Sequence, residues 1–276
     1  MKQLSTLAGV VASVFAFTSL STTAVVAQEA QTASAVVSPA KKTLADVEYR
    51  LPSTIAPTFQ RIHLNIDPDN PTYSGKTNID VTVKTPTKKV GFYQQDLTVT
   101  SARLVSGSSS FPLNVTIGEY DINWGESQDE IAPGKYTLEI TFEGKVNTSS
   151  DGMYLSRFEE TNYIFTQFED MHARKAFPSF DEPNFKIPYQ MTISSPEHQE
   201  IVGNTPVEKV TVENGIKTVV FEKTKPMPTY LIAYTVGPFD SAEISGLSVP
   251  GKIYVPKGYA DKTKFVIKHI PEILAS

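Results

Sequence analysis

The stretch TFQRIHLNIDPDNPTYSGKTNIDVTVKT, residues 58–85, decides the fold class of this chain. Apolar and polar residues alternate around Ile62 and Leu64, and they alternate again from Lys76 onward. The segment NPTYSG between the two runs holds the Asn, Pro and Gly that are typical of turns. Two alternating runs on either side of such a turn predict an antiparallel pair of β-strands.

Strand-like runs recur along the chain after this pair. They are separated by Gly, Pro, Asn and Ser, and helical periodicity is nearly absent before residue 257. The pattern predicts an all-β fold, a saddle or sandwich of mostly antiparallel sheets. The runs are KKVGFYQQ, LTVTSARLV, PLNVTIG, KYTLEITFEGKV, NYIFTQF, YQMTISS, KTVVFEKT, YLIAYTVG and GKIYVP.

Residues 257–276 follow a different pattern. Their apolar side chains recur at helical spacing, which predicts a short C-terminal helix. Pro271 lacks a backbone N–H and crowds the preceding turn, so we expect it to kink or interrupt this helix. No later segment of the sequence covers the apolar face of the helix, which is formed by Val266, Ile267, Ile270, Ile273 and Leu274.

Residues 1–27 have the order of a secretory signal peptide. Lys2 precedes an apolar run from about Leu7 to Phe17, and small residues lead to Ala27. The run is shorter than the roughly 20 apolar residues of a membrane span. We expect cleavage after Ala27, export to the periplasm or the outside, and no transmembrane segment after cleavage. Residues 28–52 are small and polar, and we interpret them as a flexible leader.

The composition excludes several classes of site. The chain has no cysteine, which rules out disulfides, a thiolate zinc site and a cysteine nucleophile. Its formal net charge is -5 and it has no basic cluster, so nothing indicates nucleic-acid binding. The four histidines occur in RIHLN, DMHAR, PEHQE and IKHIP, and none begins a His-Glu-x-x-His motif. We therefore expect no catalytic residue and no metal ligand within this chain.

The segment FTQFEDMHARKAFPSFDEPNFK, residues 165–186, is the densest in chemistry, and two interpretations compete for it. In the structural interpretation its phenylalanines fill a core, and Arg174 pairs with Asp181 or Glu182 to tie an irregular loop. In the functional interpretation its carboxylates face a ligand. The residues taken alone favour the structural interpretation.

A family resemblance reverses that preference. TQFE (166–169) followed by ARKAFPSFDEP (173–183) closely resembles the N-terminal domain of the M1 family of zinc aminopeptidases, in which the pattern is roughly Thr-Gln-x-Glu and then Ala-Arg-Arg-x-Phe-Pro-Cys-x-Asp-Glu-Pro. The flanking segments GMY, NTPV and MPTYLIA also resemble the family, in order along the chain. Two positions depart from the pattern: Ser179 stands where Cys is common, and Lys175 replaces the second Arg.

The resemblance implies a domain order. Residues 53–240 would form the aminopeptidase N-terminal β domain, and residues 241–276 would begin the catalytic domain. The family motifs Gly-x-Met-Glu-Asn and His-Glu-x-x-His, which belong to that catalytic domain, do not occur in this sequence. The resemblance thus implies a hydrolase whose Zn²⁺ belongs to a full-length parent, and we expect this chain alone to be inactive.

The resemblance also implies roles for individual residues. Glu169 would bind the α-ammonium of a peptide substrate, and Gln167 would line the same pocket. Arg174, Asp181 and Glu182 keep the structural role, as a brace behind the site. Family members often have a strained peptide bond just after this glutamate, and a cis bond between residues 169 and 170 would be a sign of a site held by its surroundings. His172, beside the site, is interpreted as a surface or loop histidine.

The implied partners are peptides with a free N-terminus and the missing catalytic domain. Two alternatives stay open. In one, the chain is complete and acts as a stand-alone periplasmic β binding module that recognises peptide N-termini. In the other, it is a degenerate relative that has lost its catalytic half and kept peptide-end recognition.

Overall fold

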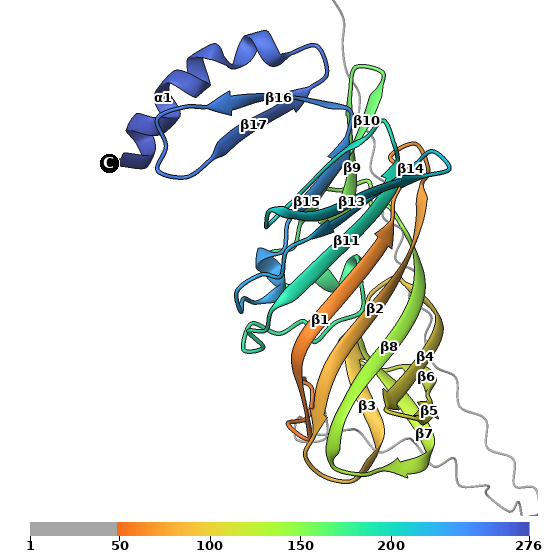
Figure 1. Cartoon of the computed structure of the whole chain (residues 1–276). Helices are drawn as coiled ribbons and strands as arrows, with labels where there is room; N and C mark the ends of the chain where they lie inside the picture. The colour runs from red at the N-terminus through yellow and green to blue at the C-terminus, as the bar shows by residue number, and fades with distance from the viewer. Residues whose placement is uncertain (1–48, 276) are drawn as a thin grey trace, which may run out of the picture. The chain divides into compact units, whose positions relative to one another are not determined.

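The computed structural model describes residues 49–275, so the predicted signal peptide and most of the predicted leader lie outside the described residues. Strands dominate this described part of the chain, which also has three short 3₁₀ turns and one C-terminal α-helix (Figure 1). The all-β prediction is therefore confirmed. The predicted boundaries of the leader, the β domain and the catalytic segment stay predictions.

The largest sheet has eight strands, and its long central strands lie side by side in Figure 1. The predicted hairpin over residues 58–85 is its centre, and its two strands pair antiparallel as expected. Only one pair in this sheet, β1 with β11, is parallel. The strand order is β13 (Val207–Glu213), β14 (Ile216–Phe221), β11 (Tyr189–Pro196), β1 (Ile55–Asn65), β2 (Thr72–Val83), β8 (Gly134–Lys145), β4 (Thr98–Ser106) and β5 (Ser109–Pro112).

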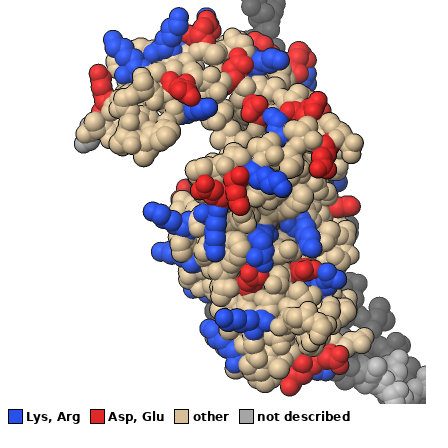
Figure 2. Space-filling model, in the orientation of Figure 1, with Lys and Arg blue, Asp and Glu red and all other residues tan. Residues whose placement is uncertain are grey.

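One face of this sheet is buried and the other is polar. Alternate residues of β2, from Tyr73 to Val83, are buried, as its period-two pattern requires. The opposite face carries ion pairs between neighbouring strands, such as Arg61 with Asp80 at 2.6 Å. Figure 2 shows this polar face, where basic and acidic side chains are interspersed.

Two smaller sheets cover the buried face, each over its own hydrophobic core. The four-stranded sheet has the order β12 (Glu200–Gly203), β15 (Tyr234–Gly237), β10 (Thr161–Gln167) and β9 (Gly152–Phe158). The three-stranded sheet has the order β3 (Thr87–Tyr93), β7 (Ile122–Ile131) and β6 (Asn114–Ile117). The irregular segment after β10 contributes to both cores: Phe168 and Phe177 are buried in the first, and Phe180 in the second.

The C-terminal residues form a hairpin and a helix. Strands β16 (Phe239–Ile244) and β17 (Gly251–Pro256) pair antiparallel, and α1 (Lys264–Ala275) follows the 3₁₀ turn η4 (Ala260–Thr263). The helix continues through Pro271, so the expected interruption of the helix there is wrong. A proline removes one N–H donor from a helix, and α1 tolerates this loss. No helix within residues 49–275 is long and apolar enough to span a membrane.

This C-terminal part touches the tip of the β9–β10 hairpin. The hydroxyl of Tyr259 donates a hydrogen bond to Glu159 Oε1 at 2.8 Å. The Tyr259 ring also packs edge-on against Phe158, with 5.1 Å between ring centroids. The hairpin tip thus holds the C-terminal part through one polar and one aromatic contact.

Candidate functional site

The two predicted substrate-binding residues lie together at the end of β10. Gln167 is the last residue of the strand, Glu169 follows two residues later, and both are exposed. The backbone N–H of Glu169 donates to Gln167 Oε1 at 3.2 Å. The amide oxygen of Gln167 thereby orients the turn that carries the carboxylate, and its second lone pair stays available to another donor.

The residues that precede them, Thr166 and Phe168, are anchored, which explains why the site residues face outward. Successive side chains of a strand point to opposite faces. Thr166 exchanges hydrogen bonds with the backbone of Tyr234 on β15, at 3.1 and 3.2 Å. Phe168 is 1% exposed and packs edge-on against Phe177 and Tyr234. Anchoring of residues 166 and 168 leaves Gln167 and Glu169 at the surface.

The peptide bond between Glu169 and Asp170 is cis. The chain then turns into the 3₁₀ turn η2 (Ala173–Lys175), after His172 donates its backbone N–H to Phe168 O at 2.9 Å. The side chain of His172 is partly buried, and its Nδ1 has no hydrogen-bond partner among the described residues.

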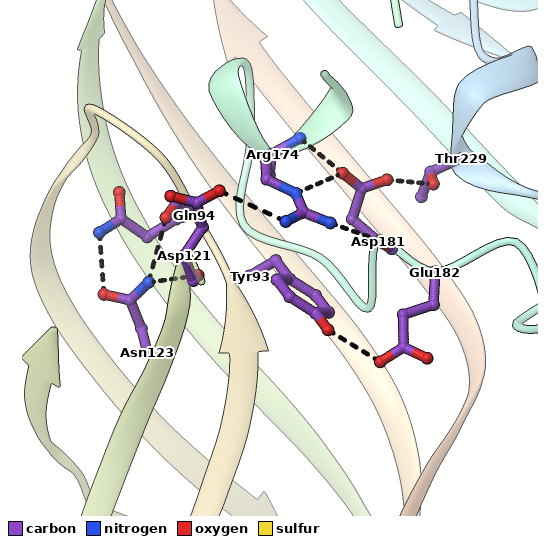
Figure 3. Close-up of polar contacts among 8 residues, drawn as sticks. All are labelled: Tyr93, Gln94, Asp121, Asn123, Arg174, Asp181, Glu182 and Thr229. Atoms are coloured by element: carbon purple, nitrogen blue, oxygen red, sulfur yellow. Dashed lines mark hydrogen bonds and ion pairs between the residues drawn. The ribbon is translucent and has the colours of Figure 1, made fainter. Parts of the chain in front are cut away.

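A buried ion pair holds this turn from behind. Arg174 Nε donates to Asp181 Oδ2 at 2.9 Å, and Arg174 Nη2 donates to the backbone oxygen of Asp181 at 2.8 Å (Figure 3). The side chains are 6% and 1% exposed. The second oxygen of Asp181 accepts the hydroxyl of Thr229. The carboxylate is therefore fully engaged, as a buried charge requires.

Arg174 also reaches the three-stranded sheet. Its guanidinium lies 4.0 Å above the ring centroid of Tyr93, and its Nη1 lies 3.4 Å from Asp121 Oδ2. Asp121 follows Tyr120 in a turn where both residues have positive φ, 61° and 57°. Asn123 supports that turn by donating to Asp121 O at 2.9 Å. Figure 3 shows Tyr93 and Asp121 approaching Arg174 from separate segments of the chain, with Asn123 behind Asp121.

Glu182 makes a separate set of contacts. The sequence left open whether Asp181 or Glu182 pairs with Arg174, and the structure pairs Arg174 with Asp181. Glu182 Oε1 instead accepts the Tyr93 hydroxyl at 2.9 Å and the backbone N–H of Leu51 at 2.8 Å. Burial and, to a smaller extent, the hydrogen bond to Glu182 raise the pKa of Tyr93, so its hydroxyl remains a donor. Glu182 thus links the backbone at Leu51, just before β1, to Tyr93 on β3.

Lys175 provides a second tie close to the site. Its ammonium pairs with Asp151, in the loop that leads into β9, and Ser149 Oγ donates to the same carboxylate at 2.7 Å. Gly152 follows with φ +67°, and a Cβ there would lie 3.0 Å from Lys175 Cβ. Since Gly152 pairs with Gln167 across the sheet, Lys175 holds the strand that flanks the predicted site.

Asp151→Asn is expected to destabilise the chain by about 1 kcal/mol at pH 7, because it removes a partly buried charged partner of Lys175. The hydrogen bond from Lys175 and, to a smaller extent, the hydrogen bond from Ser149 hold the pKa of Asp151 below its usual value. A carboxyl whose pKa is lowered by folding stabilises the folded state at any pH above its unfolded-state pKa of about 3.9. This stabilisation is lost as the pH falls through the lower pKa of the folded state. The measurement is urea unfolding at several pH values.

The difference between wild type and Asp151→Asn should therefore shrink as the pH falls below about 4. Asp261→Asn is the matched control, since Asp261 pairs with Lys262 at an exposed position, 3.7 Å apart. The control should show little effect at any pH. If the difference in free energy of unfolding between wild type and Asp151→Asn stays constant from neutral to acidic pH, the ionised carboxylate of Asp151 does not stabilise the fold.

Sequence reasoning missed several residues that the structure brings to the site. Tyr93, Asp121, Asp151 and Thr229 all contact Arg174, Lys175 or Asp181, but they lie outside the segment 165–186. None belongs to a local motif that signals its partner. The hints were two family-like segments: GMY, whose glycine lies beside Lys175, and MPTYLIA, which contains Thr229.

Two further residues bear on the chemistry of the site. Ser179, at the position where the family often has Cys, is fully buried, and its Oγ has no hydrogen-bond partner among the described residues. Its backbone pairs with that of Tyr93 at 2.8 and 3.1 Å. Within residues 49–275, no three His, Asp or Glu side chains are grouped so that they could hold a metal ion.

These features define an all-β domain whose exposed carboxylate and amide are set on a turn braced by buried charge. Residues 56–231 match the family model of the Peptidase M1 N-terminal domain. The chain belongs to the M1 peptidase family, and the matched residues are its N-terminal domain.

Three relatives illustrate the match. Aminopeptidase N of Acetobacter pasteurianus is 30% identical over 234 residues, which cover 82% of this chain and 64% of that protein. Aminopeptidase M1-D of Oryza sativa subsp. japonica is 33% identical over 226 residues, 79% of this chain and 26% of that protein. Glutamyl aminopeptidase of Bitis rhinoceros is 31% identical over 219 residues, which cover 75% of this chain and 23% of that protein. The chain thus spans 64% of the first relative and about a quarter of the others.

Proposed function

We propose that this chain forms the amine-recognising part of the peptide-binding site of an exported zinc aminopeptidase. In this proposal Glu169 binds the α-ammonium of the peptide, and Gln167 contacts the same end. The observation that carries it is the exposed carboxylate and amide, side by side at the end of β10, in a chain of the M1 family. Export follows from the predicted signal peptide.

Charge complementarity explains how such a site selects the end of a peptide. A free α-ammonium can pair with the Glu169 carboxylate, whereas an internal peptide bond offers no positive charge. Opposite charges about 4 Å apart gain about 1 kcal/mol in water and about 4 kcal/mol at an effective dielectric near 20. Glu169 is exposed, so the smaller figure applies to this chain. Any protein surface that covers Glu169 would move the pair toward the larger one.

The buried contacts behind the turn support this role. Arg174 contacts Asp121 and Tyr93, Asp181 accepts from Thr229, and Glu182 accepts from Tyr93, so the turn that carries Glu169 is held from several sides. A carboxylate fixed before the ligand arrives loses less conformational entropy on binding. The brace therefore favours recognition without touching the peptide.

The zinc that the family implies does not fit onto the described residues. They hold no group of three metal-ligating side chains, and the full sequence has no His-Glu-x-x-His motif. The proposal therefore assigns recognition of the peptide amine to this chain and assigns no step of hydrolysis to any of its residues. Peptide hydrolysis is a proposal for the whole aminopeptidase.

The test is an NMR titration of the ¹⁵N-labelled full chain with trialanine and with N-acetyl-trialanine. We expect the free-amine peptide to shift the backbone signals of Glu169 and Gln167, and the acetylated peptide to bind about fivefold more weakly, which corresponds to about 1 kcal/mol. Glu169→Gln should remove this preference, since it keeps the shape of the side chain and loses the charge.

Glu197→Gln is the matched control, because Glu197 is exposed and lies on the β11–β12 connection, outside the proposed site. It should preserve the preference for the free amine. Equal binding of the two peptides, or a preference that survives Glu169→Gln, would overturn the proposed role of Glu169.

A further inference from the structure

The outermost strand of the eight-stranded sheet, β13, has one edge without a partner strand among residues 49–275. Within these residues it pairs with β14 alone and ends the strand order of the sheet. Val207, Val210 and Val212 are each about half exposed on it, at 49%, 51% and 51%. An exposed edge with apolar side chains is a template for pairing with another strand.

The regular part of this edge has sharp limits. A register shift between Val207 and Lys209 marks a bulge at one end. At the other end, Asn214 and Gly215 have φ values of 53° and 76°, which is the signature of a two-residue type I′ turn. Residues 209–213 therefore form a straight five-residue segment, and Thr211 is its centre.

The direction of the backbone groups follows from the pairing with β14. In a two-residue hairpin the flanking residues, Glu213 and Ile216, form a hydrogen-bonded pair, and such pairs alternate along the strands. Beyond the end of β14, the N–H of Glu222 donates to Pro206 O at 2.9 Å. Residue 222 is an even number of residues from Ile216, so this bond fits a pattern in which every second residue bonds across the hairpin. Thr211 and Glu213 thus bond to β14, while Val210 and Val212 point their N–H and C=O groups outward.

The side chains of the segment divide between the two faces of the sheet. Thr211 lies opposite Thr218, whose Oγ1 contacts Ser194 on the polar face, so Lys209, Thr211 and Glu213 share that face. Val210 lies opposite Val219, which is 4% exposed in the core. The two valines 210 and 212 therefore continue the apolar face at the edge of the sheet.

We propose that β13 pairs antiparallel with β13 of a second copy of this chain, about a two-fold axis at Thr211. This register places Lys209 opposite Glu213 of the second copy and Glu213 opposite its Lys209. It places Val210 opposite Val212, on the apolar face, and makes these two positions the hydrogen-bonded pairs. One alignment thus satisfies the backbone groups, the apolar side chains and the charges, as a self-complementary two-fold interface requires.

Neighbouring registers satisfy fewer of these conditions. If the two copies shift by one residue, Val210 lies opposite Thr211. The backbone groups of Val210 point toward the second copy, whereas those of Thr211 point toward β14, so they cannot pair, and Glu208 would lie opposite Glu213. An axis at Val210 sets Lys209 opposite Thr211 and uses the bulge. The interface involves one short strand per chain, so the dimer is expected to be weak and reversible.

The test is sedimentation equilibrium of the full chain and of charge variants. Lys209→Glu alone and Glu213→Lys alone each place like charges opposite one another twice, and each should weaken dimerisation about tenfold. The double variant Lys209→Glu with Glu213→Lys restores opposite charges in the same register. It should recover the wild-type dissociation constant, which also shows that the single variants failed by repulsion and not by misfolding.

Val212→Pro is a second, independent variant. It removes an N–H that points away from β14, a position where an edge strand tolerates proline, and it should abolish the dimer while the monomer stays folded by circular dichroism. A wild-type chain that remains monomeric at its highest soluble concentration would overturn the proposal. So would a dimer that the single charge variants do not weaken, or one that the double variant fails to restore, since its interface would lie elsewhere.

Discussion

Replacing Arg174 by Met is expected to lower the free energy of unfolding of this chain by about 3–5 kcal/mol. Asp181, with a side chain 1% exposed, would keep its negative charge in the interior with only Thr229 and its own turn to solvate it. Removing one partner of a buried ion pair costs this much because the remaining charge is uncompensated. Urea unfolding, followed by circular dichroism, measures the change.

The matched control is Arg103→Met. Arg103 pairs with Glu139 at 2.6 Å, but its side chain is 56% exposed. Exposed pairs contribute about 0–1 kcal/mol, so the control should change the free energy of unfolding by no more than that. Equal effects of the two substitutions would show that the buried pair is not the brace of the turn.

Phe168→Ala should be comparably severe, with a loss of about 3–5 kcal/mol. Phe168 lies between the two predicted substrate-binding residues in the sequence, and its ring points into the core, with its centroid 5.7 Å from that of Phe177 and 6.1 Å from that of Tyr234. Truncation leaves a cavity in a close-packed core and removes the anchor that turns Glu169 outward. The same urea experiment measures the stability change, and the trialanine titration should show weaker binding.

Phe265→Ala serves as the control for this substitution. Phe265 is 74% exposed on α1, so its truncation should stay within about 0.5 kcal/mol. A mild effect of Phe168→Ala, similar to that of the control, would mean that the turn does not depend on this core contact.

The fold class could be predicted because its signal is local. The alternation in residues 58–85 repeats with the two-residue period of a strand, and the structure pairs these residues as β1 and β2. The helix at the C-terminus was visible for the same reason. The effect of Pro271 was not, because one missing N–H does not outweigh the rest of α1.

The contacts behind the site could not be predicted because they join distant segments. Asp121 lies 53 residues from Arg174, and Leu51 lies 131 residues from Glu182. The choice between Asp181 and Glu182 was open because two adjacent carboxylates both suit an arginine. Which of them meets Arg174 depends on the direction of each side chain, and that direction is set by tertiary packing that no local pattern encodes.

The placement of the phenylalanines after β10 has a consequence for the cooperativity of unfolding. Segments that carry binding residues are commonly drawn from the least stable parts of a protein and open locally. Here Phe168 and Phe177 belong to one core and Phe180 to the other, so this segment cannot detach without disrupting both. The two cores are thereby coupled into a single cooperative unit, and the hydrogen-bonded amides of His172, Ala176 and Phe177 should exchange with solvent only when the whole β domain opens.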